Sequence, residues 1–270
     1  MGVLAVEINV LGSLFLSHEN KQYMMASKRA SVVLSLLALS PGVPIAFDQL
    51  VDELWAEQRM VNPRNALQAN IGRLRKLLES VAGEKGSDLL RTVNSGYLLD
   101  VPANAVDAHR FLALADTGAD LVRRDPAGAI VALEAALGLW RGPALMDACD
   151  GLRCRIQAAH LEERRITAYE DLTAAKLAVD AARVSVSELR QLAAEHSERE
   201  RLSELLMLAL YRDGRQTEAL EVFHGARRRL AGDLGLEPGR ALHRAYQAIL
   251  QHDDTLGEPR RALVPAGRAS

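Results

Sequence analysis

The sequence predicts an α+β domain over residues 1–101, followed by an all-α domain of helical repeats over residues 106–252. Three observations support this. Apolar residues alternate at period two near the N-terminus, three amphipathic segments of period 3.6 follow, and strand patterns vanish in the second half. With 270 residues, 49% of them apolar, the chain can fill two cores. Residues 254–270 are rich in Pro, Gly and Arg without periodicity, which predicts a disordered tail.

Composition narrows the classes of protein. The formal net charge is −2, so only the distribution of charge can indicate a nucleic-acid partner. No apolar run approaches the roughly 18 residues of a membrane span, and no membrane partner is expected. The N-terminus has no basic leader and alternates apolar with polar residues, which favours a strand over a signal peptide. We therefore expect a cytoplasmic protein.

The first elements are two strands and a helix. Val6, Ile8 and Val10 alternate with polar residues, as in a half-buried strand. The turn signal SHENKQ follows, and YMM is read as the return strand. Ser27 is placed to cap a helix through SKRASVVLSLLALS, which stops before Pro41-Gly42.

A second helix is predicted after residue 47, with Asp48 as its N-cap. Four apolar residues on one face are expected to be buried: Phe47, Val51, Leu54 and Trp55.

The third helix contains NPRNALQANIGRLRKLL, residues 62–78. At 100° per residue, four apolar residues lie within about 60° of each other and predict the core stripe. They are Leu67, Ile71, Leu74 and Leu78.

The other side of the third helix has amide, guanidinium, ammonium and small side chains, and no acid occurs between Glu57 and Glu79. Amide and guanidinium groups can form paired hydrogen bonds to adenine or guanine edges. A glycine inside a helix costs roughly 1 kcal/mol relative to alanine, and close approach to another surface is one reason to accept that cost. The predicted face consists of Asn65, Gln68, Ala69, Gly72, Arg73, Arg75 and Lys76.

Charges in this half are segregated by helix. Ten basic and ten acidic residues balance over residues 1–101, but the second helix carries the acids and the third the bases. A solvated surface helix usually mixes signs to form i,i+4 pairs. For the third helix taken by itself, a solvated basic face remains the alternative. The acids are Asp48, Asp52, Glu53 and Glu57.

The context of the third helix favours DNA. LLRTVNSGYLLDV reads as two short strands around Asn94-Ser95-Gly96, a hairpin. A helix followed by a short hairpin is the winged helix-turn-helix arrangement, in which the helix enters the major groove and the hairpin tip reaches the backbone or minor groove. Donors at the tip are Arg91, Thr92, Asn94 and Ser95. Lys28 and Arg29 open the first helix, where free N–H groups favour a phosphate.

The second half contains a repeat. Gly214, Ala219, Phe223 and Ala226 have the offsets of a tetratricopeptide helix pair, and Ala129, Leu133 and Ala136 repeat the last three offsets ninety residues earlier. Small residues at these positions let antiparallel helices approach closely, and the aromatic fills the gap between pairs. On periodicity alone, a generic helical bundle is the alternative.

No catalytic residue, metal or cofactor is predicted. The chain has no HExxH, GxSxG, GxxxxGK[ST] or GxGxxG motif. Its seven histidines are scattered without ligand spacing. Cys149 and Cys154 are expected to be ordinary reduced thiols, because no other Cys and no nearby His pair completes a metal site; a reversible disulfide or half a metal site is the alternative.

Several segments together resemble the Streptomyces antibiotic regulatory proteins. LGSLFL, the SKRASVVLSLLALSPG helix, DQLVDELW, NALQANIGRLRKLL and RTVNSGYLLDV resemble, in order, the OmpR-type winged helix of that family. VDAHRFLAL, ALGLWRGPAL and the long block containing LYRDGRQTEAL and LGLEPG resemble its bacterial transcriptional activation domain. The resemblance covers about 250 of the 270 residues. The stretch DAARVSVSELRQLAAEHS departs from the family, whose members often carry Gly-Arg-His and a Pro there.

The resemblance implies an activator of secondary-metabolite genes. Such proteins bind tandem direct repeats of double-stranded DNA near the promoter −10 element, recruit RNA polymerase through its sigma factor and core subunits, and self-associate on DNA. It also implies that one loop contacts the polymerase: Glu57, Gln58, Arg59, Met60, Val61, Asn62, Pro63 and Arg64. Without an ATPase, receiver or forkhead-associated module, the chain is expected to be the short form.

Two other classes of protein are the alternatives. In one, the helical repeats form an interaction scaffold and the winged helix is structural or binds protein. In the other, the chain is an enzyme, which the missing motifs disfavour. The helical groove could hold a small-molecule effector, but no residue singles one out.

Overall fold

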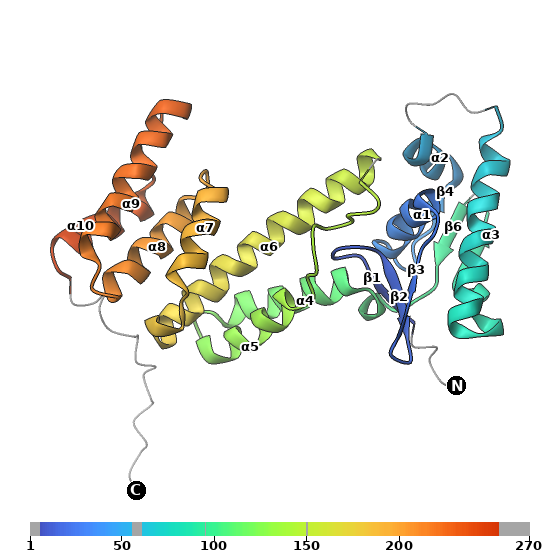
Figure 1. Ribbon diagram of the computed structural model, residues 1–270, viewed down its shortest axis with the longest axis horizontal. Helices are drawn as coiled ribbons and strands as arrows, with labels where there is room; N and C mark the ends of the chain where they lie inside the picture. The colour runs from blue at the N-terminus through green and yellow to red at the C-terminus, as the bar shows by residue number, and fades with distance from the viewer. Residues whose placement is uncertain (1–5, 56–60, 95, 150, 254–270) are drawn as a thin grey trace, which may run out of the picture. The chain divides into compact units, whose positions relative to one another are not determined.

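The computed structural model describes residues 6–55, 61–94, 96–149 and 151–253 (Figure 1). Contacts divide the chain into two compact units. One unit contains Met1–Asp116 and Glu134–Thr167, and the other contains Thr117–Leu133 and Ala168–Ser270. The first unit therefore holds more than the expected α+β domain, because the start of the helical half folds with it. None of the described helices is both long and apolar enough to cross a membrane.

Three strands form where two were predicted: β1 (Glu7–Asn9), β2 (Phe15–His18) and β3 (Lys21–Met24) make an antiparallel sheet in that order, and β2 extends into the predicted turn. Ile8 pairs with Leu16 and both are fully buried, as the period-two pattern predicts. Glu19 and Asn20 both have positive φ in the turn between β2 and β3. This is the backbone that a two-residue hairpin needs to match the twist of its strands.

The first helix, α1 (Lys28–Ala38), begins as predicted, with the Ser27 side chain accepting a hydrogen bond from the N–H of Ala30. The prediction for α2 (Phe47–Trp55) was wrong in two respects. Asp48 lies inside the first turn and is not the cap; Gln49 instead accepts a hydrogen bond from the N–H of Ala46. The helix starts early because residues 45 and 46 are held in a short strand, β4.

The buried face of α2 also differs from the expected one. Leu50, Glu53 and Trp55 are buried, whereas Val51 and Leu54 are only partly covered. A buried glutamate was not expected, because an unpaired carboxylate in a core is costly. The partners of Glu53 lie in the helical half of the chain, and they explain why the face is rotated.

The third helix, α3 (Pro63–Ala82), contains the predicted core stripe. Leu67, Ile71, Leu74 and Leu78 are all buried. The Asn62 side chain caps the helix by accepting a hydrogen bond from the N–H of Asn65, and Pro63 occupies the first turn, where its missing N–H costs nothing. Pro63 and Arg64 therefore belong to the helix and not to the preceding loop, contrary to expectation.

The predicted hairpin is present as β5 (Leu90–Val93) and β6 (Gly96–Leu99), preceded by the 3₁₀ segment η1 (Glu84–Leu89). β4 (Ile45–Ala46), which was not predicted, pairs with β6 and completes a sheet of order β4-β6-β5. A Cβ at position 96 would lie 2.2 Å from the carbonyl oxygen of Ile45, so the pairing of β4 requires Gly96.

The helical half begins with η2 (Ala103–Ala105) and contains seven α-helices among the described residues. They are α4 (Asp107–Leu121), α5 (Pro126–Leu137), α6 (Leu152–Val179), α7 (Val186–Glu195), α8 (Glu200–Arg212), α9 (Gln216–Arg229) and α10 (Arg240–Leu250). Between α5 and α6 the described residues are mainly turns and bends.

That irregular segment packs on the N-terminal sheet. Leu11 forms an isolated antiparallel bridge with Ala144. The buried Asp107 carboxylate accepts hydrogen bonds from the N–H groups of Val10 and Leu11, at 2.8 and 3.1 Å, and pairs with Arg141 at 2.9 Å. Backbone groups that the sheet leaves unpaired at its end are thus satisfied from the helical half.

The repeat positions behave as the tetratricopeptide offsets predict. Ala219, Phe223 and Ala226 are buried, and so are Ala129, Leu133 and Ala136. Gly214 has a φ of 76° in the tight turn between α8 and α9. Phe223 on α9 stacks on Tyr246 on α10, with ring centroids 4.1 Å apart, so the aromatic does fill the space beside the helix pair.

Candidate nucleic-acid interface

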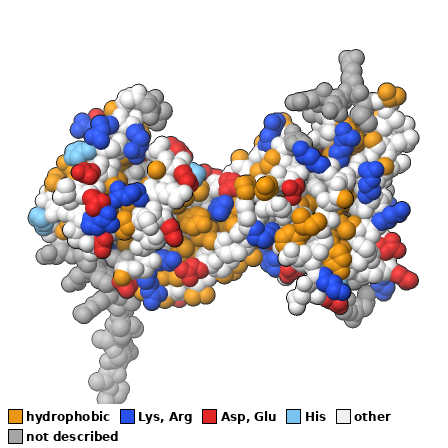
Figure 2. Space-filling view, in the orientation of Figure 1, with side chains coloured by type: hydrophobic (Ala, Val, Ile, Leu, Met, Phe, Trp, Pro, Cys, Tyr) orange, Lys and Arg blue, Asp and Glu red, His pale blue; other side chains and the backbone are white. Residues whose placement is uncertain are grey.

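The outer face of α3 is the centre of the candidate interface. Asn65, Gln68, Ala69, Arg73 and Lys76 are exposed. Figure 2 shows Lys and Arg side chains along the edge of the molecule that α3 forms, with the acidic ones of this edge toward its lower end. Because the opposite stripe is buried, the helix is fixed in rotation and this face is held toward solvent.

Gly72 lies in the middle of this face. A Cβ built at position 72 would meet no atom of the described structure within 4 Å. Packing inside the protein therefore gives no reason for a glycine here. The helix bears a cost of about 1 kcal/mol that no contact in the described structure offsets, as expected for a helix turn that an external surface approaches closely.

Arg73 is oriented by a residue that the sequence analysis missed. Asn70 is buried, and its Oδ1 accepts a hydrogen bond from Arg73 Nη1 at 3.2 Å and one from Ser27 Oγ at 3.4 Å. Its Nδ2 donates to the carbonyl of Ala66 at 2.8 Å. Asn70 thus links the cap of α1 to the outer face of α3. An amide at the edge of an otherwise apolar stripe was the available signal.

The Arg75 guanidinium forms hydrogen bonds within the protein. Its Nε and Nη2 donate to the carbonyl oxygen of Leu90, at 3.1 and 3.0 Å, and Nη2 also donates to Thr92 Oγ1 at 2.8 Å. Both predicted donors, Arg75 and Thr92, are therefore engaged with each other. Their contact joins α3 to β5, so the orientation of the hairpin depends on the helix.

The remaining hairpin residues are at the tip and the flank. Arg91 pairs with Asp100 at 3.0 Å, and both side chains are more than half exposed, so this pair contributes little to stability. Asn94 has a φ of 39°, which an asparagine tolerates better than most residues. Ser95 lies outside the described residues.

Lys28 and Arg29 occupy the first turn of α1, as predicted. The Ser27 side chain already caps one of the free N–H groups of this turn. The guanidinium of Arg29 lies 5.6 Å from the ring centroid of Trp55, a distance at which a cation interacts with an aromatic face. Trp55 thereby holds Arg29 close to α2.

The expected polymerase-contact loop is described only at its end. Glu57, Gln58, Arg59 and Met60 lie outside the described residues. Val61 is exposed, Asn62 caps α3, and the guanidinium of Arg64 lies 5.2 Å from the ring centroid of Phe47.

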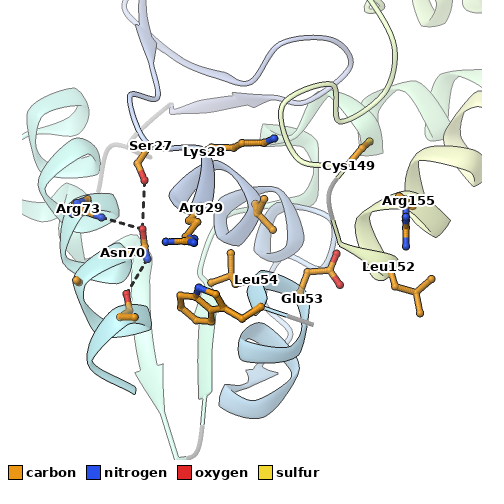
Figure 3. Close-up of a pocket in the computed structure, with 14 residues that line it drawn as sticks. Ser27, Lys28, Arg29, Glu53, Leu54, Asn70, Arg73, Cys149, Leu152 and Arg155 are labelled. Atoms are coloured by element: carbon orange, nitrogen blue, oxygen red, sulfur yellow. Dashed lines mark hydrogen bonds between the residues drawn. The ribbon is translucent and has the colours of Figure 1, made fainter. Parts of the chain in front are cut away.

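A hollow of about 980 Å³ lies beside α3 (Figure 3). Its walls come from the start of α1, the end of α2, the first half of α3 and the residues leading into α6. Four cations line it: Lys28, Arg29, Arg73 and Arg155. Arg155 and the other residues from the helical half were not anticipated, because nothing in the sequence brings residue 155 near residue 28.

Glu53 is the one acid that lines this hollow among the described residues. Its carboxylate accepts hydrogen bonds from the N–H groups of Arg153 and Cys154, at 2.9 and 2.8 Å, and so caps α6. Burial raises the pKa of the Cys154 thiol well above its ordinary value, and the neighbouring Glu53 carboxylate raises that pKa further. The Cys154 thiol therefore stays protonated, and neither Cys149 nor Cys154 is in a disulfide.

No group of three or more metal-ligating side chains occurs among the residues that the structure describes. The site consists of cations, amides and a small-residue centre on a helix that is followed by a hairpin. Such a surface has the groups that contact phosphates and base edges in nucleic-acid complexes.

Comparisons with known proteins agree with this geometry. Residues 106–250 match the model of the bacterial transcriptional activator domain, and residues 21–99 match that of the transcriptional regulatory protein, C terminal. The transcriptional regulator RedD of Streptomyces coelicolor is 43% identical over 94% of this chain and 73% of its own length. The regulatory protein DnrI of Streptomyces peucetius is 34% identical over 92% of this chain and 93% of its own length.

A solved structure, Mycobacterium tuberculosis EmbR in complex with a low affinity phosphopeptide, matches with a TM-score of 0.86 and 29% identity. The match covers 94% of this chain and 68% of that one. The fold and these relatives define a DNA-binding regulator of transcription, not an enzyme. Within that class, the chain belongs to the Streptomyces antibiotic regulatory protein family.

Proposed function

We propose that the protein activates a secondary-metabolite biosynthetic gene cluster, at the nucleoid, by binding direct repeats near the promoter −10 element and recruiting RNA polymerase holoenzyme. The observation that carries the proposal is the exposed, acid-free face of α3, which is held outward by the buried stripe behind it. Contacts to phosphates supply affinity, and the amides and Arg73 of α3 read base edges.

Polymerase recruitment is assigned to residues 57–64, which lead from the end of α2 into the first turn of α3. A protein bound there would therefore lie close to DNA read by α3. Two protomers on adjacent repeats would face the same side of the duplex when the repeats are one helical turn, about 10–10.5 base pairs, apart. This spacing would favour self-association on DNA.

Footprinting on the promoters beside the gene tests the DNA half of the proposal. We expect protection of two or more direct repeats near the −10 element, and weak competition by random-sequence DNA. Equal competition by random DNA would instead favour an interaction scaffold whose winged helix does not read sequence.

Transcription in vitro with purified holoenzyme tests the recruitment half. Arg59→Ala combined with Met60→Ala should leave the footprint unchanged and abolish activation, because both residues precede α3 in the sequence and are not among the proposed base-reading residues. A variant that activates normally would reject the loop as the polymerase contact. Activation by residues 106–252 alone would reject the adaptor mechanism altogether.

A further inference from the structure

The hollow beside α3 has walls from both halves of the sequence. Ala66, Ala69 and Arg73 line it from α3, and Leu152 and Arg155 line it from α6. In Figure 3, Arg73 lies on α3, Lys28 and Arg29 lie at the start of α1, and Arg155 projects from α6. All of these residues belong to the same compact unit. The activation-domain helix α6 therefore forms part of the surface next to the reading face.

The charge of the hollow is positive. Four cations line it, against one carboxylate among the described lining residues. Both oxygens of that carboxylate, on Glu53, are occupied by backbone N–H groups at the start of α6. The Glu53 charge is thus already stabilised by the helix it caps, and the cations are the groups that the hollow presents to an incoming anion.

Arg155 is the cation of this hollow whose position no contact among the described residues explains. Its side chain is exposed and has no hydrogen-bond or ion-pair partner among the described residues. Arg164 on the same helix, by contrast, pairs with Asp116. An arginine that lines a positive hollow and has no partner in the described part of the chain is placed to contact an external acid group.

We propose that the phosphate backbone beside the groove read by α3 lies in this hollow, and that Arg155 of the activation domain contacts it. This inference rests on the proposed function, because it takes the α3 face as the reader. Arg73 belongs both to that face and to the wall of the hollow, so a duplex bound on the face would lie next to the hollow. The DNA contact then extends beyond the winged helix.

Salt dependence of promoter binding by the full chain tests the proposal. For Arg155→Ala, the slope of log K for DNA binding against log salt concentration should become less steep by about 1. Binding to promoter DNA and to random DNA should weaken by similar factors, because a phosphate contact carries no sequence information. Arg155→Lys should keep the slope, since a point charge suffices. Arg153→Ala is the matched control: it lies one residue beyond Leu152, is exposed, and does not line the hollow.

The wild-type result separates the two proposals. If wild type does not prefer promoter over random DNA, the proposed function fails. If wild type is specific but Arg155→Ala keeps the full slope, or Arg153→Ala loses as much, only the assignment of Arg155 fails. Single methylphosphonate substitutions in the promoter give a direct check. Neutralising one particular phosphate should weaken DNA binding by wild type and leave binding by Arg155→Ala unchanged. If no phosphate gives this result, the contact does not exist.

Discussion

Glu53 Oε1 accepts a hydrogen bond from the Cys154 N–H at 2.8 Å, although 101 positions separate these two residues in the chain. Cys154 lies in the first turn of α6, so Glu53 caps that helix. The approach is so close that a Cβ at position 151 would lie 2.0 Å from the same oxygen, and the chain has glycine there. The second helix of the winged domain and the longest helix of the activation domain are thus joined through one carboxylate.

Removing this carboxylate should destabilise the protein. Glu53→Ala leaves the part-buried N–H of Arg153 and the buried N–H of Cys154 without their acceptor. We expect a loss of about 1–3 kcal/mol in the free energy of unfolding, measured with urea. Glu53→Gln keeps one acceptor oxygen and should lose less. If both variants are as stable as wild type, the cap does not contribute to stability.

Two basic residues on the outer face of α3 should matter for DNA and not for folding. Arg73→Ala and Lys76→Ala are each expected to weaken promoter binding, while thermal unfolding stays close to wild type because both side chains are exposed. If the residue contacts a phosphate, its loss should also lower the salt slope by about 1. Unchanged binding of both variants at physiological salt would reject this face as the reader.

Asn70 should act through Arg73. Removing its side chain by Asn70→Ala frees the Arg73 guanidinium, so we expect poorer discrimination between promoter and random DNA. In a double-mutant cycle, Asn70→Ala should add little to Arg73→Ala, whereas it should add fully to Lys76→Ala, with which Asn70 shares no contact in the described structure. Additivity with Arg73→Ala would show that Asn70 is only a structural residue.

Gly72→Ala should separate stability from binding. The new methyl group meets no protein atom within 4 Å, so the helix should gain up to about 1 kcal/mol, while a duplex close to position 72 should bind more weakly. Gly225→Ala on α9 is the control, because its Cβ would make only an ordinary contact, 3.5 Å from Arg229 Nη1, far from α3 in the sequence. Equal binding by Gly72→Ala would mean that DNA does not approach this turn.

Local patterns predicted much of this molecule. The Ser27 cap, the Leu67–Leu78 stripe, the hairpin and the repeat alanines all depend on residues close in sequence, where periodicity and capping rules apply. β4 was not predicted, because two residues are too few to show an apolar–polar alternation.

What local patterns could not give are contacts between distant segments. A glutamate in an amphipathic helix is ordinarily a surface residue, and only its partners on α6 explain why Glu53 is buried. In the sequence, Arg75 is predicted to donate hydrogen bonds to DNA. In the structure its guanidinium donates to the Leu90 carbonyl and to Thr92 Oγ1 instead. The Asp107 carboxylate likewise accepts hydrogen bonds from the N–H groups of Val10 and Leu11, which are nearly 100 positions away in the sequence.

The Asp107 contacts bear on how regulators of this family can be recombined. A chain cut between residues 101 and 106 would leave the Val10 and Leu11 N–H groups and the Glu53 carboxylate without their partners. To exchange promoter preference between two such regulators, the winged helix should therefore be grafted together with the start of α4 and the first half of α6. The alternative is to change only the outward side chains of α3 and to leave the rest of the chain intact.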